Sequence, residues 1–175
     1  MRVITIQNKN VVNTLLKTGK YTLDNAVLYA NLIKPYQFMM KHYNYNHYPI
    51  FLCPVGYRVN FGGANLENAY MIEMEIPDRY CKIQDYYGWS DFIYFTECPN
   101  EFTGFIRCNT VEQYGTYILD MYKSKKLIDH KVVYQVTTQF LNKSWIKTIK
   151  PVNEKFIELY YDTGGANILR SIADK

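Results

Sequence analysis

The stretch Ala69-Tyr70-Met71-Ile72-Glu73-Met74-Glu75-Ile76 is the clearest strand in the chain, and it decides the fold class. Successive side chains of a strand point to opposite faces, so the apolar and acidic residues separate. One face carries Ile72, Met74 and Ile76, and the other carries Met71, Glu73 and Glu75. Pro77 follows and ends the strand, because proline cannot donate a hydrogen bond to a sheet.

Glu73 and Glu75 are candidate catalytic residues. Two carboxylates on one face of a strand can act as a general acid and a general base. The commoner interpretation is that both lie on the solvent-facing side of a half-exposed antiparallel sheet. We favour this second interpretation and test both against the structure.

The residues before this strand predict a first strand and two helices. Val3–Ile6 is rich in β-branched residues and is typical of a strand. Apolar residues at helical spacing between Asn8 and Gly19 predict a short helix, which Asn8 or Asn10 can cap and Gly19 can end. Asp24 can cap a second helix, and we expect Pro35 to break or restart it.

The residues after this strand predict mostly strands. The apolar segment Trp89–Phe95 fits a strand or a helix, and Asn109 can open a further helix. Lys131–Leu141 and Phe156–Tyr161 are expected to be strands, with a turn at Gly164-Gly165. This order favours the α+β class. We expect a single domain over residues 1–175, with a curved or split, mostly antiparallel sheet and helices packed near the N-terminal half.

Composition excludes several function classes. The chain has 175 residues, of which 48% are apolar, so it can bury a core without a disulfide or a metal. A net charge of +4 without a dense basic stripe differs from the pattern of dedicated nucleic-acid binders. Neither the four cysteines nor the three histidines have metal-site spacing, so we expect no metal. No signal peptide or membrane span is evident, so a cytoplasmic protein with reduced thiols and no membrane partner is expected.

Tyrosine is the unusual component of the composition. The chain has 18 tyrosines and 9 phenylalanines. One interpretation is codon usage in an AT-rich genome, which also favours Asn, Lys and Ile. The other is a tyrosine-lined surface for a flat ligand or a partner protein, where such rings are common anchors.

Short motifs are spread over most of residues 3–95 and, more thinly, over residues 131–149. They are Thr5-Ile6-Gln7, Gly19-Lys20-Tyr21, Tyr36 with Met39, Pro49-Ile50-Phe51, Glu73-Met74-Glu75-Ile76-Pro77-Asp78, Trp89, and Gln135 with Trp145. Together they resemble a bacterial family of uncharacterised proteins known only as a domain of unknown function. Phe38 and Phe51 stand where that family commonly has tryptophan.

The first strand, the glycine turn after the first helix and a late strand with Gln135 also resemble the layout of ADP-ribosyltransferases of the DNA-modifying toxin type. The resemblance implies that NAD is bound in a cleft of a split sheet. It also implies that Thr5 and Gln7 lie near the nicotinamide and that Tyr21 or Tyr36 stacks on a ring.

The late strand of these transferases carries Gln-x-Glu, whereas this chain has Gln135-Val136-Thr137. The family's glutamate orients the ribose hydroxyls and stabilises the positive charge that develops as nicotinamide leaves, and threonine has no charge to offer. The resemblance implies that Gln135 and Thr137 approach the ribose. Transfer would then require another carboxylate in the cleft, such as Glu73, Glu75 or Asp91.

These observations give three hypotheses. The first is an NAD-binding domain of the ADP-ribosyltransferase type, acting as a mono-ADP-ribosyltransferase on a protein or nucleic-acid acceptor. It requires the first strand and the Gln135 strand to lie side by side around a crevice for nicotinamide. The alternative is a non-catalytic, phage- or plasmid-borne inhibitor that binds a protein through a tyrosine-rich surface. The third is an enzyme that stacks nucleotide bases on its tyrosines.

Overall fold

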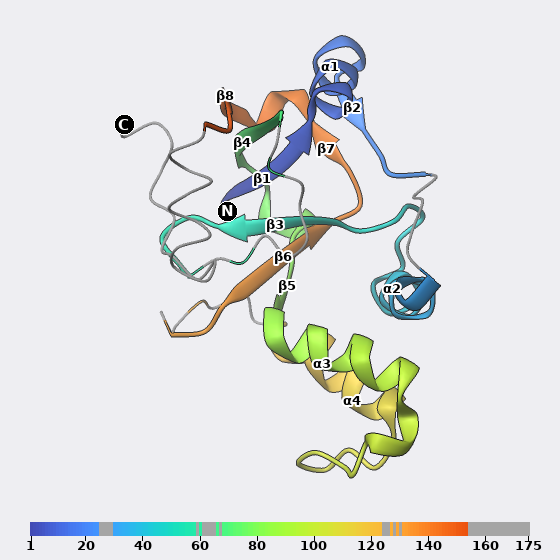
Figure 1. The fold of residues 1–175 in the computed structure, drawn as a ribbon. Helices are drawn as coiled ribbons and strands as arrows, with labels where there is room; N and C mark the ends of the chain where they lie inside the picture. The colour runs from blue at the N-terminus through green and yellow to red at the C-terminus, as the bar shows by residue number, and fades with distance from the viewer. Residues whose placement is uncertain are drawn as a thin grey trace.

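The computed structural model describes residues 1–24, 30–58, 60, 66, 68–123, 127, 129 and 131–153. Within these residues, four helices accompany a six-stranded antiparallel sheet and a second sheet of two strands (Figure 1). The predicted α+β class and the antiparallel sheet are therefore confirmed. The six strands lie in the spatial order β5-β6-β3-β1-β4-β8.

The large sheet consists of β1 (Arg2–Asn8), β3 (Ile50–Pro54), β4 (Ala69–Glu75), β5 (Lys82–Asp85), β6 (Tyr134–Thr138) and β8 (Ile146–Pro151). The small sheet pairs β2 (Lys20–Tyr21) with β7 (Leu141–Asn142). The helices are α1 (Lys9–Thr18), α2 (Ala30–Tyr43), α3 (Tyr86–Glu97) and α4 (Val111–Asp120).

The sheet is continuous between β1 and β4 and opens between β1 and β3. β1 pairs with β4 along its whole length, from Arg2 opposite Glu75 to Asn8 opposite Ala69. With β3 it pairs only at Val3 and Ile4. On its opposite edge, β3 pairs with β6 through Ile50, Phe51 and Leu52. The large sheet therefore splits on the C-terminal side of Ile4.

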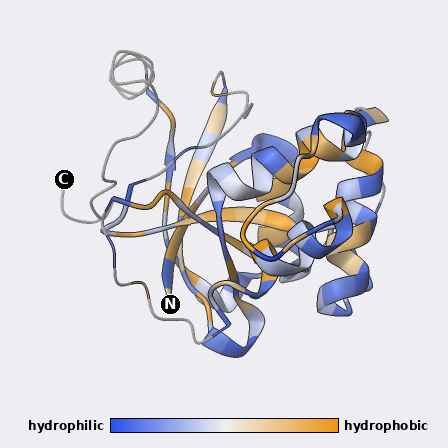
Figure 2. Cartoon of the chain, turned by 90° about the horizontal axis from the view of Figure 1, so that it is seen from below, coloured by the Kyte–Doolittle hydropathy of each residue, from blue (hydrophilic) through white to orange (hydrophobic). Residues whose placement is uncertain are grey.

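Two apolar clusters hold the layers together. The larger cluster joins one face of the sheet to α1, and it includes Val12, Leu15, Leu52, Ile72 and Val136. The second cluster lies among α2, α3 and α4, with Met39, Trp89, Phe92, Tyr114 and Ile118 as buried members. Phe51 of β3 packs against this second cluster, so it links the helices to the sheet. Figure 2 shows apolar residues concentrated on the central strands, whereas polar and apolar stretches alternate along the helices.

The sequence favours a solvent-facing side chain for both Glu73 and Glu75. This prediction is wrong for Glu73 and confirmed for Glu75. The Glu73 side chain is 0% exposed, and its Oε1 accepts a hydrogen bond from Arg2 Nε at 3.1 Å. Glu75 is 57% exposed and forms an ion pair with Lys147 at 2.8 Å. A buried carboxylate needs a charged or hydrogen-bonding partner, and Arg2 on the neighbouring strand supplies one.

Several predicted elements differ in the structure. Pro35 lies inside α2 rather than breaking it, and it leaves the carbonyl of Asn31 without its helical donor. The segment 89–95 belongs to α3, and α4 shows that the helices are not confined to the N-terminal half. The predicted strand 131–141 divides into β6 and β7. The strand predicted at 156–161 and the turn at 164–165 lie outside the described residues.

The close contact of α4 with its neighbours gives a test of the packing. A Cβ atom at Gly115 would lie 2.7 Å from Phe92 Cζ and 2.9 Å from Phe38 Cε1. We expect Gly115→Ala to lower the free energy of unfolding by about 1–3 kcal/mol, because overpacking outweighs the gain in helix propensity. Urea denaturation measures this change. Thr116→Ala, at the exposed neighbouring position, is the control and should leave stability unchanged or slightly higher.

Candidate functional site

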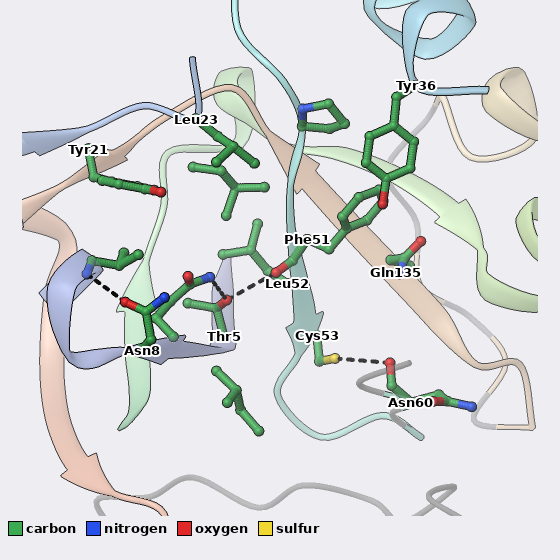
Figure 3. Close-up of a pocket in the computed structure, with 15 residues that line it drawn as sticks. Thr5, Asn8, Tyr21, Leu23, Tyr36, Phe51, Leu52, Cys53, Asn60 and Gln135 are labelled. Atoms are coloured by element: carbon green, nitrogen blue, oxygen red, sulfur yellow. Dashed lines mark hydrogen bonds between the residues drawn. The ribbon is translucent and has the colours of Figure 1, made fainter. Parts of the chain in front are cut away.

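A pocket of about 340 Å³ lies where the sheet opens, and Figure 3 shows its lining. Small-molecule sites span about 300–1,000 Å³, so this pocket is of the size of a small ligand or of one end of a larger ligand. The lining residues come from six separate parts of the chain. They are Thr5, Ile6, Gln7, Asn8, Val11, Tyr21, Leu23, Tyr36, Pro49, Ile50, Phe51, Leu52, Cys53, Asn60 and Gln135.

Thr5 forms two side-chain hydrogen bonds at the point where β1 and β3 separate. The buried Thr5 hydroxyl donates a hydrogen bond to the Phe51 carbonyl at 3.0 Å, just past the last paired residues of β1 and β3. Gln7 Nε2 donates to the same hydroxyl at 2.8 Å. The amide nitrogen of Gln7 is therefore occupied, and its Oε1 accepts no hydrogen bond from the described residues.

Asn8 and Tyr21 complete this side of the pocket. Asn8 ends β1 and caps α1, because its Oδ1 accepts a hydrogen bond from the Val11 N–H at 3.0 Å. Gly19 then ends α1 with a φ of 82°, so the chain turns back into β2 with Tyr21. Burial, and next the Asp24 carboxylate, raise the pKa of Tyr21, so its hydroxyl is protonated at neutral pH and can donate a hydrogen bond.

Tyr36 and Gln135 form the other side of the pocket. The Tyr36 ring lies 5.4 Å from the Phe51 ring and 6.3 Å from the Trp89 ring, centroid to centroid. Gln135 Oε1 accepts a hydrogen bond at 3.2 Å from Nε2 of Gln84, which is itself fully buried. This contact fixes the orientation of the Gln135 amide.

The structure separates the two strands that were expected to lie side by side. β3 lies between β1 and β6 in the sheet. Figure 3 shows β3 passing between Thr5, Asn8 and Tyr21 on one side and Tyr36 and Gln135 on the other. That part of the prediction is wrong because β3 pairs with both strands. The pocket nevertheless includes residues of both, since it extends across β3.

The predicted cofactor-binding residues lie together in the structure, whereas most of the predicted catalytic residues lie elsewhere. Thr5, Gln7, Tyr21 and Tyr36, together with Gln135, line the pocket. Thr137 is on the same strand as Gln135 but is fully buried, and its Oγ1 has no hydrogen-bond partner among the described residues. Neither Glu73 nor Glu75 lines the pocket, and Asp91 lines a different one.

The lining is electrically neutral. Among the described residues that form the pocket, none is acidic or basic. Burial raises the pKa of Tyr36 to about 12 and that of the Cys53 thiol to about 12, so both are protonated at pH 7. The lining therefore offers aromatic faces, amides and hydroxyls for binding, and it offers no ionised nucleophile or base.

Sequence reasoning missed part of the lining. Asn8 was interpreted only as a helix cap, and Phe51 only as part of a family motif in which tryptophan is common at its position. Asn60 follows β3, and its carbonyl accepts a hydrogen bond from Cys53 Sγ at 3.8 Å. A signal for Phe51 existed, since an aromatic residue between two apolar strand residues in Ile50–Leu52 predicts a ring on the opposite face.

Other candidate chemistry is absent from the described part of the chain. It contains no group of three or more Cys, His, Asp or Glu side chains that could hold a metal ion. Cys53, Cys81, Cys98 and Cys108 are free thiols, and only Cys98 is not buried. His42 and His47 contact Asp120 and Asp24, respectively.

Comparison of the chain with protein-family models, curated proteins and solved structures finds no match. The described residues form no helix that is long and apolar enough to span a bilayer. The function is therefore argued from the pocket itself.

The Thr5 hydroxyl gives a test of how the opening is held. We expect Thr5→Val to lower the free energy of unfolding by about 1–2 kcal/mol, since the Phe51 carbonyl loses its donor and Gln7 loses its acceptor. Urea denaturation measures the change. Thr148→Val on β8, whose hydroxyl makes no hydrogen bond with the described residues, is the matched control and should cost less. Equal costs for the two variants would contradict the assignment.

Proposed function

We propose that this domain binds NAD in the pocket across β3. The observation that carries the proposal is the convergence of Thr5, Gln7, Tyr21, Tyr36 and Gln135 on one pocket from widely separated positions in the sequence. These are the residues that the resemblance to ADP-ribosyltransferases assigns to NAD. Aromatic rings stack on flat heterocycles, and amides hydrogen-bond to their polar edges.

The arrangement of the lining suits the nicotinamide half of the dinucleotide. Nicotinamide lies beside Gln7 and Tyr21, where the Gln7 Oε1 can accept a hydrogen bond from a carboxamide N–H. The attached ribose then extends across β3 toward Gln135. The neutral lining contains no cation for the diphosphate, so the phosphates and the adenosine lie outside the pocket.

The same lining favours binding over transfer. Transfer of ADP-ribose develops positive charge on the ribose as nicotinamide leaves, and a carboxylate stabilises that charge best. No carboxylate is present among the described lining residues, and Thr137 turns its hydroxyl into the buried interior. We therefore propose an NAD-binding domain whose described residues do not complete a transferase site.

Calorimetric titration with NAD, nicotinamide mononucleotide and ADP-ribose tests the proposal. We expect NAD and nicotinamide mononucleotide to bind, and ADP-ribose, which lacks nicotinamide, to bind more weakly. Tyr21→Leu should weaken NAD binding by about tenfold, because it removes a stacking ring. Tyr94→Leu removes a tyrosine that is 48% exposed and outside the pocket, so it is the matched control.

Two outcomes would contradict the proposal. The absence of any heat of binding with NAD and with the mononucleotide would remove NAD as the ligand. Transfer of label from radioactive NAD to protein or nucleic-acid acceptors, abolished by Gln135→Leu, would show that the site is catalytic despite its neutral lining.

A second candidate function is a non-catalytic inhibitor that binds a protein through exposed aromatic residues. The observation that favours it is an apolar group on α3 and the loop after it, in which Tyr87, Tyr94, Phe105 and Ile106 are 46–70% exposed. Such rings are common anchors at protein interfaces. We expect Phe105→Ser with Ile106→Ser to abolish capture of a partner from a bacterial lysate and to leave NAD binding unchanged. Capture that survives the double change would exclude this surface.

A further inference from the structure

A second pocket lies between α3, α4 and the loop that follows α3, away from the NAD site. Its volume is about 410 Å³, and it shares no lining residue with the pocket across β3. Its lining consists of Asp85, Tyr87, Gly88, Asp91, Phe95, Phe102, Thr103, Gly104, Phe105, Tyr114, Ile118 and Met121.

Helical spacing explains why these residues share one pocket. On α3, Gly88, Asp91 and Phe95 are three and four residues apart, so they lie on one face of the helix. On α4, Tyr114, Ile118 and Met121 follow the same spacing, although Met121 is the residue that ends the helix. The two faces meet across Gly88, where a Cβ atom would lie 3.4 Å from Ile118 Cγ1.

Aromatic rings form much of the wall. The rings of Phe95 and Phe102 lie 5.2 Å apart, and those of Phe105 and Tyr114 lie 5.3 Å apart, centroid to centroid. Tyr114 is buried at the base, whereas Tyr87 and Phe105 are about half exposed at the rim. The faces of such rings carry negative electrostatic potential and attract cations.

Two carboxylates add negative charge to this aromatic wall. Asp85 caps α3, because its Oδ1 accepts a hydrogen bond from the Gly88 N–H at 2.7 Å. Asp91 lies one turn further along and makes no hydrogen bond or ion pair with the described residues. Burial, and next the Asp85 carboxylate, raise the pKa of Asp91. No Lys, Arg or His is among the described lining residues to neutralise the pair.

We propose that this pocket binds an organic ammonium ion, meaning a small cation with methyl or methylene groups around its charge. The alkyl groups contact the rings of Phe95, Phe105 and Tyr114, and the charge faces Asp91 and Asp85. A bare metal ion fits less well, since it needs a shell of oxygen, nitrogen or sulfur ligands, and the described residues provide no cluster of three such acidic, His or Cys groups.

Choline and its uncharged carbon isostere, in which a tert-butyl group replaces trimethylammonium, test the proposal by calorimetric titration. The two probes have nearly the same shape, so a difference in affinity measures the effect of the charge. We expect choline to bind at least about tenfold more tightly than the isostere. Equal affinity for both probes, or no binding of choline, would overturn the proposal.

Matched variants assign the effect to the pocket. Asp91→Asn should weaken choline binding by about fivefold and leave binding of the isostere unchanged, because only the cation loses a charged partner. Asp91 is exposed and makes no contact that the fold requires, so the variant should unfold at the same urea concentration as the original protein. Glu97→Gln removes a charge from the same helix outside the pocket and should change neither affinity. A loss of choline binding in Glu97→Gln equal to that in Asp91→Asn would attribute the effect to general charge and overturn the proposal.

Discussion

The hydrogen bond from the Thr5 hydroxyl to the Phe51 carbonyl marks the point on which the organisation of this molecule depends. On one side of it, β1 and β3 are paired as in an ordinary antiparallel sheet. On the other side, β1 continues along β4 while β3 continues along β6. A side chain thus replaces the backbone ladder where the two strands separate. The separation creates the pocket without leaving the Phe51 carbonyl unsatisfied.

The two pockets differ in the chemistry that they offer. The pocket across β3 has amides, hydroxyls and neutral tyrosines, and its thiol and phenol groups are held protonated by burial. The pocket between α3 and α4 combines aromatic rings with two carboxylates. The first pocket therefore offers rings and amides to a flat heterocycle, and the second offers rings and negative charge.

The sequence predicted those features that depend on local pattern. The strand at 69–75, the cap of α1 at Asn8 and the Gly19 turn each involve neighbours in the chain, and each is present in the structure. The predicted alternation of that strand is wrong, because Met71 and Glu73 are buried as well as Ile72 and Met74. β5 and β8 were not predicted because they form the two edges of the large sheet, where short, half-exposed strands carry little alternation. The burial of Glu73 depends on Arg2, which is 71 residues away in the sequence, and no local pattern reveals that partner.

The candidate site shows the same division between local and distant information. Of the residues that the family resemblance assigned to NAD, Thr5, Gln7, Tyr21, Tyr36 and Gln135 line one pocket, whereas Thr137 does not. It did not reveal that β3 lies between β1 and β6, because strand pairing is decided by contacts across the whole chain. The position of β3 changes the interpretation of the pocket, since a ligand must cross a strand rather than enter a crevice between two neighbours.

The short pairing of β1 with β3 also has a mechanical consequence. Seven paired residues of β1 join it to β4, whereas two join it to β3. Two hydrogen bonds adjoin the shorter pairing, from the Val55 N–H to the Arg2 carbonyl at 3.1 Å and from the Thr5 hydroxyl to the Phe51 carbonyl at 3.0 Å. A force that pulls β5 and β8 in opposite directions would act on these few hydrogen bonds. β1 and β3 would then separate before the other strand pairs of the sheet. The halves β5-β6-β3 and β1-β4-β8 would then behave as two rigid plates joined by a hinge.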